Sequence, residues 1–473
     1  MHRLVIIHTN DIHSHFEKMP AIAERIRRLT DGLSPDQALI VDCGDHLDRS
    51  RLETEGSGGA VNIAIMNATG YEFAVPGNNE GLTFTPRMLE ELYSKARFSV
   101  ICSNLRDQKT GAAPPWMKPY CIVRKGALRV GLIGLTAPFA SFYSLLGWDV
   151  LPPLETAAHW VDRIRPKVDM IVVLSHLGLS NDERLALEVP GIDVILGAHT
   201  HHLLEQPVRK GNTYLCAAGK FGEHVGVAEF QFDPATRRVS LVEGRCIAVD
   251  AGEGSRDIAE RIEAHREQSR TRLSEVVAVL DEPLPIDWER ETTLGNVMAA
   301  GLRKWTNAEI GLVNAGQMLR GLEKGGITRE RLLRLCPSPV NPCSIRLRGE
   351  HIWRALEEAL LTDFQQKVIR GFGFRGERLG ILCLDGLTVE YVAAREAYRK
   401  IERITVNGQP LDLNREYKVG TIDMFTFGVG YCSIREGSDV RYYLPEFLRD
   451  VLERELQNAA AIAAGRTRRW IAL

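Results

Sequence analysis

The stretch Leu4-Val5-Ile6-Ile7-His8-Thr9-Asn10-Asp11-Ile12-His13 decides the fold. Its four leading apolar residues are typical of a buried strand, and two metal-ligand side chains, Asp11 and His13, follow closely. Residues two apart in an extended segment face the same side, so both can approach one site. In an open α/β sheet, side chains just past the carboxyl ends of the strands share one crevice. The stretch therefore predicts an α/β sheet with a binding site at that edge.

The same arrangement recurs at four more places in the first half of the chain. At each place a short apolar run is followed by one or two potential metal ligands. These are Asp45 after residues 38–41, Asn78 after 73–75, His176 after 170–174, and His199 with His201 after 194–196.

Two Asp, four His and one Asn, without a Cys, suit two divalent cations that share a carboxylate. Asp45 follows Gly44 at a tight turn and is the predicted bridging ligand. Asn78 would add a neutral amide oxygen and leave a net charge suited to a phosphate. Mn²⁺, Fe²⁺, Zn²⁺ and Mg²⁺ all accept such donors. Each residue alone also has a structural interpretation, such as a core histidine at His176, but their joint occurrence at five strand ends favours a two-metal site.

Strand-like runs alternate with helical patterns up to about residue 250, and the runs at 225–232 and 239–246 look like an antiparallel pair. Residues 255–276 contain no Gly or Pro and predict one exposed helix with a thin apolar stripe. We therefore expect an α/β (α+β) chain with mixed sheets. Its predicted parts are a catalytic domain at 1–250, a linker helix at 251–279 and a second α/β domain at 280–473.

The composition is that of ordinary globular domains, with 44% hydrophobic and 25% charged residues and a formal net charge of -2. No run of five like charges occurs, so neither nucleic-acid polymers nor anionic membranes are implied as partners. The apolar run before His8 is shorter than the roughly 7–15 residues of a secretory signal. Nine cysteines without a CxxC pair favour reduced thiols. We expect a cytoplasmic protein.

Five blocks of the first half resemble the metallophosphoesterase motifs of 5′-nucleotidases. They are His8-Thr9-Asn10-Asp11-Ile12-His13, Gly44-Asp45, Gly77-Asn78-Asn79-Glu80, Ser175-His176-Leu177-Gly178 and Gly197-Ala198-His199-Thr200-His201. Two later blocks, Val313-Asn314-Ala315-Gly316 and Pro337-Ser338-Pro339-Val340-Asn341, look like parts of the family's C-terminal domain. The resemblance spans nearly the whole chain. It implies a four-layer metallophosphoesterase sandwich followed by a substrate-recognition domain, in a branch that lacks a signal peptide.

The resemblance also implies roles for the ligands. Asp11, His13, Asp45 and His201 would hold one metal, and Asp45, Asn78, His176 and His199 the other. Asp45, His176 and Asn79 would be the catalytic residues. Two cations roughly 3.5–4 Å apart lower the pKa of a bound water, which would then attack phosphorus in line.

One departure from the family bears on the chemistry. The family places a His directly after the ligand Asn and an Asp three residues further on, whereas this chain has Asn79 and Leu82. An amide can donate a hydrogen bond to a phosphoryl oxygen but carries no titrating proton. We expect either a replacement acid or a preference for good leaving groups, such as a phosphoanhydride. The candidate replacement acids are His15, His46 and His202.

The second domain would supply substrate contacts by the same resemblance. Asn314 opens the first block, and Arg320 follows it one residue beyond the usual spacing as a candidate phosphate contact. Two F-x-F pairs, Phe372 with Phe374 and Phe425 with Phe427, fall where the family's base-stacking residues lie. We expect Phe372 and Phe425 to stack on a base, although core packing would explain the same spacing. The family's late acidic residue is Val429 here.

The predicted function is hydrolysis of nucleotide phosphate monoesters by a water bound at two divalent cations. The substrate would be a small nucleotide or a related phosphate ester. Two alternatives stay open. One is a hydrolase of another phosphoester or anhydride, such as a cyclic nucleotide or a sugar nucleotide. The other is a nucleotide-binding sensor with little turnover, which the missing His/Asp pair favours.

Overall fold

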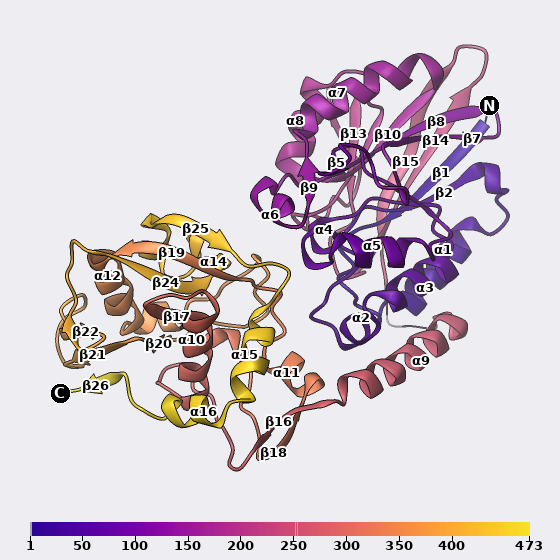
Figure 1. Ribbon diagram of the computed structural model, residues 1–473. Coiled ribbons are helices and arrows are strands. Elements are labelled where there is room, and N and C mark those ends of the chain that lie inside the picture. The colour runs from indigo at the N-terminus through magenta and orange to yellow at the C-terminus, as the bar shows by residue number, and fades with distance from the viewer. Residues whose placement is uncertain (1, 251, 253) are drawn as a thin grey trace. The chain divides into compact units, whose positions relative to one another are not determined.

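The computed structural model describes residues 2–250, 252 and 254–473 (Figure 1). The chain forms two compact units, Met1–Ser269 and Arg270–Leu473. Both contain helices and mixed sheets, so the expected α/β fold class is confirmed. The helix expected at 255–276 is α9 (Arg256–Leu273), and its few buried apolar side chains include Ile258 and Ile262.

The first unit is built on two large sheets. The seven-stranded sheet has the order β15 (Arg238–Ala248), β14 (His224–Asp233), β1 (His2–Thr9), β2 (Ala38–Asp42), β3 (Phe73–Ala74), β4 (Ser99–Ile101) and β6 (Met117–Lys118). The six-stranded sheet has the order β12 (Val208–Lys210), β13 (Thr213–Ala217), β11 (Val194–Gly197), β10 (Met170–His176), β8 (Leu128–Thr136) and β7 (Tyr120–Lys125). A small pair joins β5 (Leu105–Asp107) to β9 (Trp148–Val150).

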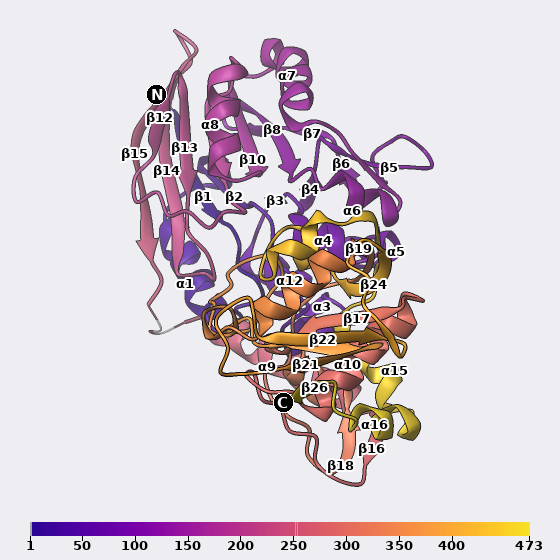
Figure 2. The same ribbon diagram turned by 90° about the vertical axis from the view of Figure 1, so that its left-hand side faces the viewer.

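Helices lie around the two sheets (Figure 2). They are α1 (Met19–Thr30), α2 (Leu52–Ser57), α3 (Ala60–Thr69), α4 (Asn78–Thr83), α5 (Pro86–Tyr93), α6 (Ala140–Leu145), α7 (Pro153–Ile164) and α8 (Leu179–Glu188), with the 3₁₀ turns η1 (Pro35–Gln37) and η2 (Arg165–Lys167). Helices α7 and α8 lie beside β8 and β10 (Figure 2), and they pack on β8, β10 and β11 through one apolar cluster.

The central strands explain where the donors gather. β1, β2 and β3 are parallel neighbours, and so are β8, β10 and β11. All seven residues of β10 are buried, as expected of a strand covered on both faces. The antiparallel pair expected near residues 225–246 is β14 with β15. Parallel strands end at one edge of their sheet, so the residues after β1, β2 and β3 are brought together.

The second unit has its own core around helix α10 (Thr293–Trp305) and a five-stranded sheet. That sheet has the order β20 (Leu382–Asp385), β17 (Ile310–Asn314), β24 (Glu416–Ile422), β19 (Pro342–Arg348) and β25 (Ser438–Tyr442). A two-stranded sheet pairs β16 (Val276–Leu280) with β18 (Gly325–Thr328). A four-stranded sheet has the order β23 (Gln409–Pro410), β22 (Ile401–Val406), β21 (Leu387–Tyr391) and β26 (Trp470–Ala472). The remaining helices are α11 (Arg329–Leu335), α12 (Gly349–Ala359), α13 (Thr362–Gln365), α14 (Asp423–Thr426), α15 (Leu448–Leu456) and α16 (Ala459–Gly465), with η3 (Ala315–Gln317) and η4 (Cys432–Glu436).

Candidate metal centre

Of the seven expected ligands, His176 ends β10 and Asn78 begins α4, while the other five lie in loops that follow β1, β2 and β11. Five of them have a left-handed backbone, with φ of 51° at Asp11, 47° at His13, 51° at Asp45, 72° at His199 and 60° at His201. Residues other than glycine adopt this conformation at a cost, and such residues cluster at functional sites. The loops after β1 and β2 hold each other, because Asp11 N donates to Gly44 O and His13 N donates to Asp45 O, at 2.9 and 2.8 Å.

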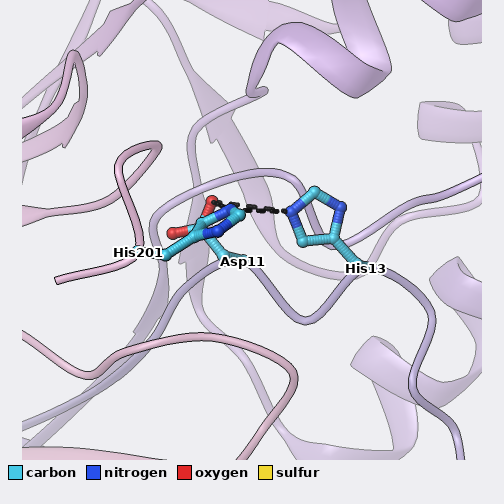
Figure 3. Close-up of side chains that lie close together, drawn as sticks. All are labelled: Asp11, His13 and His201. Atoms are coloured by element: carbon cyan, nitrogen blue, oxygen red, sulfur yellow. Dashed lines mark hydrogen bonds and ion pairs between the residues drawn. The ribbon is translucent and has the colours of Figure 1, made fainter. Parts of the chain in front are cut away.

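One group of ligand atoms comes from Asp11, His13 and His201, which are directed toward one another in Figure 3. The Nε2 atoms of the two histidines are 3.2 Å apart. Asp11 Oδ1 lies 3.5 Å from His201 Nε2 and 3.8 Å from His13 Nε2. These spacings leave the three atoms around one point, as ligands of a shared cation are arranged.

A second group comes from Asp11, Asp45 and His176. The two carboxylate oxygens of Asp45 face different histidines, since Oδ1 lies 3.3 Å from His176 Nε2 and Oδ2 lies 3.8 Å from His13 Nε2. Asn78 Oδ1 is 3.2 Å from His176 Nε2, and the ring of His199 lies 5.2 Å from the ring of His176. Asp45 thus faces one histidine of each group, and Asp11 belongs to both groups, so the bridging role of Asp45 stays a prediction.

Burial and charge act together on these side chains. Burial alone would raise the pKa of Asp45, but the neighbouring His176 and His13 lower it well below its usual range. Burial lowers the pKa of His176, and the carboxylates of Asp45 and Asp11 outweigh it and raise that pKa to about 10. Burial lowers the pKa of His199 to about 4 and that of His201 to about 3. A metal replaces the protons that these oppositely charged groups otherwise share.

Two buried side chains that were not among the predicted site residues support the ligand loops. Glu80 accepts the backbone N–H groups of Asp45 at 3.0 Å, Leu47 at 2.8 Å and Gly77 at 2.8 Å. Asn10 donates to Asp11 Oδ2 at 2.8 Å and to Gly219 O at 2.7 Å. The sequence could have indicated this role of Glu80, because an acidic residue three positions after the N-cap residue of a helix typically accepts backbone N–H groups at the start of that helix.

Asn79 and Leu82 occupy the positions of the family's His and Asp. The Asn79 amide lies beside the ligand His13, with Nδ2 3.0 Å from His13 Nδ1 and 3.2 Å from Leu47 O. Its backbone N donates to Asp45 Oδ1 at 2.8 Å. Leu82 is half-buried. This amide side chain is thus already engaged by groups of the protein.

The three candidate acids lie in different surroundings. The His15 ring stacks on the Phe221 ring, with the ring centres 4.1 Å apart, and the Phe221 ring lies 5.7 Å from the His13 ring. His46 is buried beside Tyr71, and burial lowers its pKa to about 3. His202 is exposed and its Nδ1 lies 2.8 Å from Thr200 Oγ1. Of the three, the structure brings His15 to the ring that borders the ligand histidines.

The expected substrate contacts separate into buried and exposed side chains. Asn314 is buried at the end of β17 and donates to Leu379 O at 2.7 Å, whereas Arg320 is exposed. Phe425 is 0% exposed and Phe374 is 5% exposed, and both belong to the apolar core.

The remaining two phenylalanines form an exposed pair. Phe372 and Phe427 are 55% and 42% exposed, and their rings stack at 6.1 Å. The expectation that Phe425 stacks on a base is therefore corrected, since its ring has no face open to a ligand. Phe427 is the exposed partner of Phe372.

Comparisons with known proteins agree with this geometry. Residues 4–203 match the calcineurin-like phosphoesterase family, and residues 276–431 match the 5′-nucleotidase C-terminal domain. The chain belongs to the metallophosphoesterases of the 5′-nucleotidase type, which hydrolyse phosphoesters at a dimetal centre.

Among individual relatives, the chain is 37% identical to the metallophosphoesterase YunD of Bacillus subtilis over 95% of this chain and 98% of that protein. It is 23% identical to human 5′-nucleotidase over 88% of this chain and 81% of that protein. Two solved structures share its fold. The 5′-nucleotidase precursor of Thermus thermophilus has a TM-score of 0.61 and 23% identity, and the match covers 100% of this chain and 99% of that one. The NAD nucleotidase of Haemophilus influenzae has a TM-score of 0.69 and 16% identity, and the match covers 99% of this chain and 97% of that one.

The described part of the chain contains no helix with the length and apolar character needed to cross a membrane. The nine cysteines are free thiols, and six of them are buried.

Proposed function

We propose that this protein hydrolyses the phosphate ester or anhydride bond of a small nucleotide. The observation that carries the proposal is the position of Asp45, whose two carboxylate oxygens face His176 and His13 in the two ligand groups. All the donors are oxygen or imidazole nitrogen, which suits two divalent cations. When bound, two such cations supply an activated water and neutralise charge on the phosphoryl group.

The protein's own side chains would hold and orient the reacting groups. We assign Asp11, His13, Asp45 and His201 to one cation and Asp45, Asn78, His176 and His199 to the other. The left-handed loops fix these donors before a substrate arrives, so little reorganisation is needed. Asp45 and His176 remain the proposed catalytic ligands, and Asn79 acts beside His13.

The nucleoside part of the substrate would meet the second unit. The exposed pair Phe372 and Phe427 supports stacking on a base, because aromatic faces open to solvent bind flat, apolar rings. Arg320 is exposed and remains the proposed phosphate contact. Asn314 is buried, and its side chain would contribute by holding the backbone carbonyl of Leu379 in place.

The amide side chain at Asn79 bears on which leaving group the substrate has. An amide protonates no leaving oxygen, and general acid help is worth typically about 10²–10⁴-fold. A substrate whose leaving group needs no proton would avoid this loss. We therefore favour a nucleoside diphosphate or a sugar nucleotide over a monophosphate ester.

A comparison of substrates tests both parts of the proposal. The purified chain with Mn²⁺ would be assayed for phosphate release from AMP, ADP and an activated aryl phosphate, and for release of the nucleoside monophosphate from a sugar nucleotide. We expect turnover that Asp45→Asn abolishes, and faster turnover of the anhydrides and the aryl phosphate than of AMP. Equal rates on AMP and the aryl phosphate would contradict the leaving-group preference. No turnover with any divalent ion would contradict hydrolysis and favour a nucleotide sensor.

We also propose a cytoplasmic location and a role in nucleotide breakdown. Nine unpaired thiols support a reducing compartment. Fractionation of cells producing the tagged chain would test the location. The boundaries at residues 250 and 280 stay proposals, and limited proteolysis would map them.

A further inference from the structure

The imidazole ring of His13 has two different surroundings. Its Nε2 atom faces other ligands, 3.2 Å from His201 Nε2 and 3.8 Å from Asp45 Oδ2. Its Nδ1 atom faces two side chains that are not ligands, Asp48 Oδ2 at 3.5 Å and Asn79 Nδ2 at 3.0 Å. Nε2 is therefore the nitrogen that would bind a metal, and Nδ1 lies on the far side of the ring.

An imidazole that binds a metal through Nε2 carries its proton on Nδ1 and needs an acceptor there. His176 already has this arrangement, because its Nδ1–H donates to Cys43 O at 2.8 Å while its Nε2 faces Asp45. His13 has no backbone carbonyl at its Nδ1 in the described contacts. The groups that the structure places at this nitrogen are the side chains of Asp48 and Asn79.

Asp48 fits this role better than Asn79. The Asn79 amide presents its Nδ2 donor to His13 Nδ1 and donates to Leu47 O at 3.2 Å with the same nitrogen. Once Nδ1 holds a proton, donor would face donor. Turning the amide would remove that conflict but would deprive Leu47 O of its donor. A carboxylate only accepts, so Asp48 needs no rearrangement.

The Asp48 carboxylate is also held in place. The residue is 3% exposed, and its Oδ1 accepts from Ser50 N at 2.8 Å. Its backbone N donates to Ser14 Oγ at 2.8 Å, and Ser14 Oγ in turn accepts from Asn62 Nδ2 at 3.0 Å. These contacts fix the second oxygen beside His13 before any metal binds.

We propose that Asp48 is a positioning residue: its carboxylate accepts the Nδ1–H of His13 and fixes the ring in the tautomer whose Nε2 binds metal. The proposal rests on the proposed function only in taking this cluster as a metal site. It also explains how His13 is oriented although the amide of Asn79 presents a donor to the same ring nitrogen.

Calorimetric titration of Mn²⁺ into the metal-stripped full chain tests the proposal without any substrate. Outer hydrogen-bond partners of metal-bound histidines are worth about 10–100-fold in metal affinity. We expect a weakening of that size at one of the two sites in Asp48→Asn. Asp169→Asn is the matched control, since that buried carboxylate accepts Arg129 N just before β10, at the end of the strand opposite His176.

An unchanged Mn²⁺ affinity in Asp48→Asn, or an equal loss in Asp169→Asn, would overturn the proposal. If Asp48→Asn does not fold, nitrogen-15 NMR of the unchanged chain with Zn²⁺ decides the matter. A proton on His13 Nδ1 that is protected from exchange supports the proposal, whereas a proton on Nε2 overturns it. A chain that binds Mn²⁺ as expected but hydrolyses nothing would contradict only the proposed function.

Discussion

At the scale of single residues, exposure decides which aromatic side chains can meet a substrate. Phe425 lies in helix α14 and turns into the core, while Phe427 lies just after that helix and turns outward. Phe372 has a left-handed backbone, with φ of 53°, and Phe374 two residues later is buried. Neither F-x-F pair therefore lies on one face, as it would in a strand.

The exposed pair gives a prediction about substrate binding. Stacking of a base on an aromatic ring is worth about 1–3 kcal/mol, which corresponds to about 5–150-fold in affinity. Phe372→Ala should raise KM for a nucleotide by an amount in this range and should leave KM for an aliphatic phosphate ester, which has no ring to stack, unchanged. Steady-state kinetics on both substrates would measure it.

Tyr398→Ala is the control for this change, because Tyr398 is another exposed aromatic residue, 49% exposed, in the same unit. If Phe372→Ala raised KM equally for the nucleotide and the aliphatic phosphate ester, base stacking on Phe372 would be wrong.

At the scale of elements, the ligand loops after β2 and β3 approach each other as closely as backbones can. A Cβ atom on Gly77 would lie 2.1 Å from Asp45 Oδ1, and one on Gly44 would lie 2.7 Å from Gly77 N. Gly44 also has φ of 94°, which favours glycine. The short strand β3 followed directly by α4 is thus fixed by contact with the Asp45 loop.

This contact predicts the effect of Gly77→Ala. The added methyl group must displace the carboxylate of Asp45, and overpacking of this kind costs typically about 1–3 kcal/mol. We expect a lower thermal midpoint and a loss of Mn²⁺ affinity, measured by calorimetry. Gly70→Ala, where a Cβ meets nothing within 4 Å, is a control for backbone strain without crowding. Equal Mn²⁺ affinity in the two variants would argue against displacement of Asp45.

At the scale of the whole molecule, the ligand groups belong entirely to the first of two compact units. Each unit has its own apolar core, so each can unfold as a separate transition. A metal that binds only the folded first unit stabilises that unit alone. At a concentration of about 1,000 times Kd, the stabilisation is about 4 kcal/mol.

Metal removal should therefore act on one transition. For a unit of this size, about 4 kcal/mol corresponds to a shift of roughly 8–16 °C in Tm. Scanning calorimetry with Mn²⁺ and then with excess chelator should lower one midpoint by this amount and leave the other in place. Equal shifts of both midpoints, or none, would contradict the assignment of the metal centre to the first unit.

The sequence alone predicted the α/β fold class and the seven candidate ligands, because both follow from local pattern. Polar donors after apolar runs mark strand ends, and parallel strands must end together. The glycine before Asp45 marked a tight turn in the same way. The family resemblance added the assignment of each ligand to one of the two metals.

Only the tertiary structure decided which side chains surround those ligands. The approach of Asp48 to His13, the support of Asp45 by Glu80, and the burial of Phe425 but not Phe427 depend on contacts between segments far apart in the chain. Local periodicity carries no information on such contacts, since each side chain's partner is chosen by how the whole core packs. The sequence thus determined what could bind a metal, and packing determined what holds it in place.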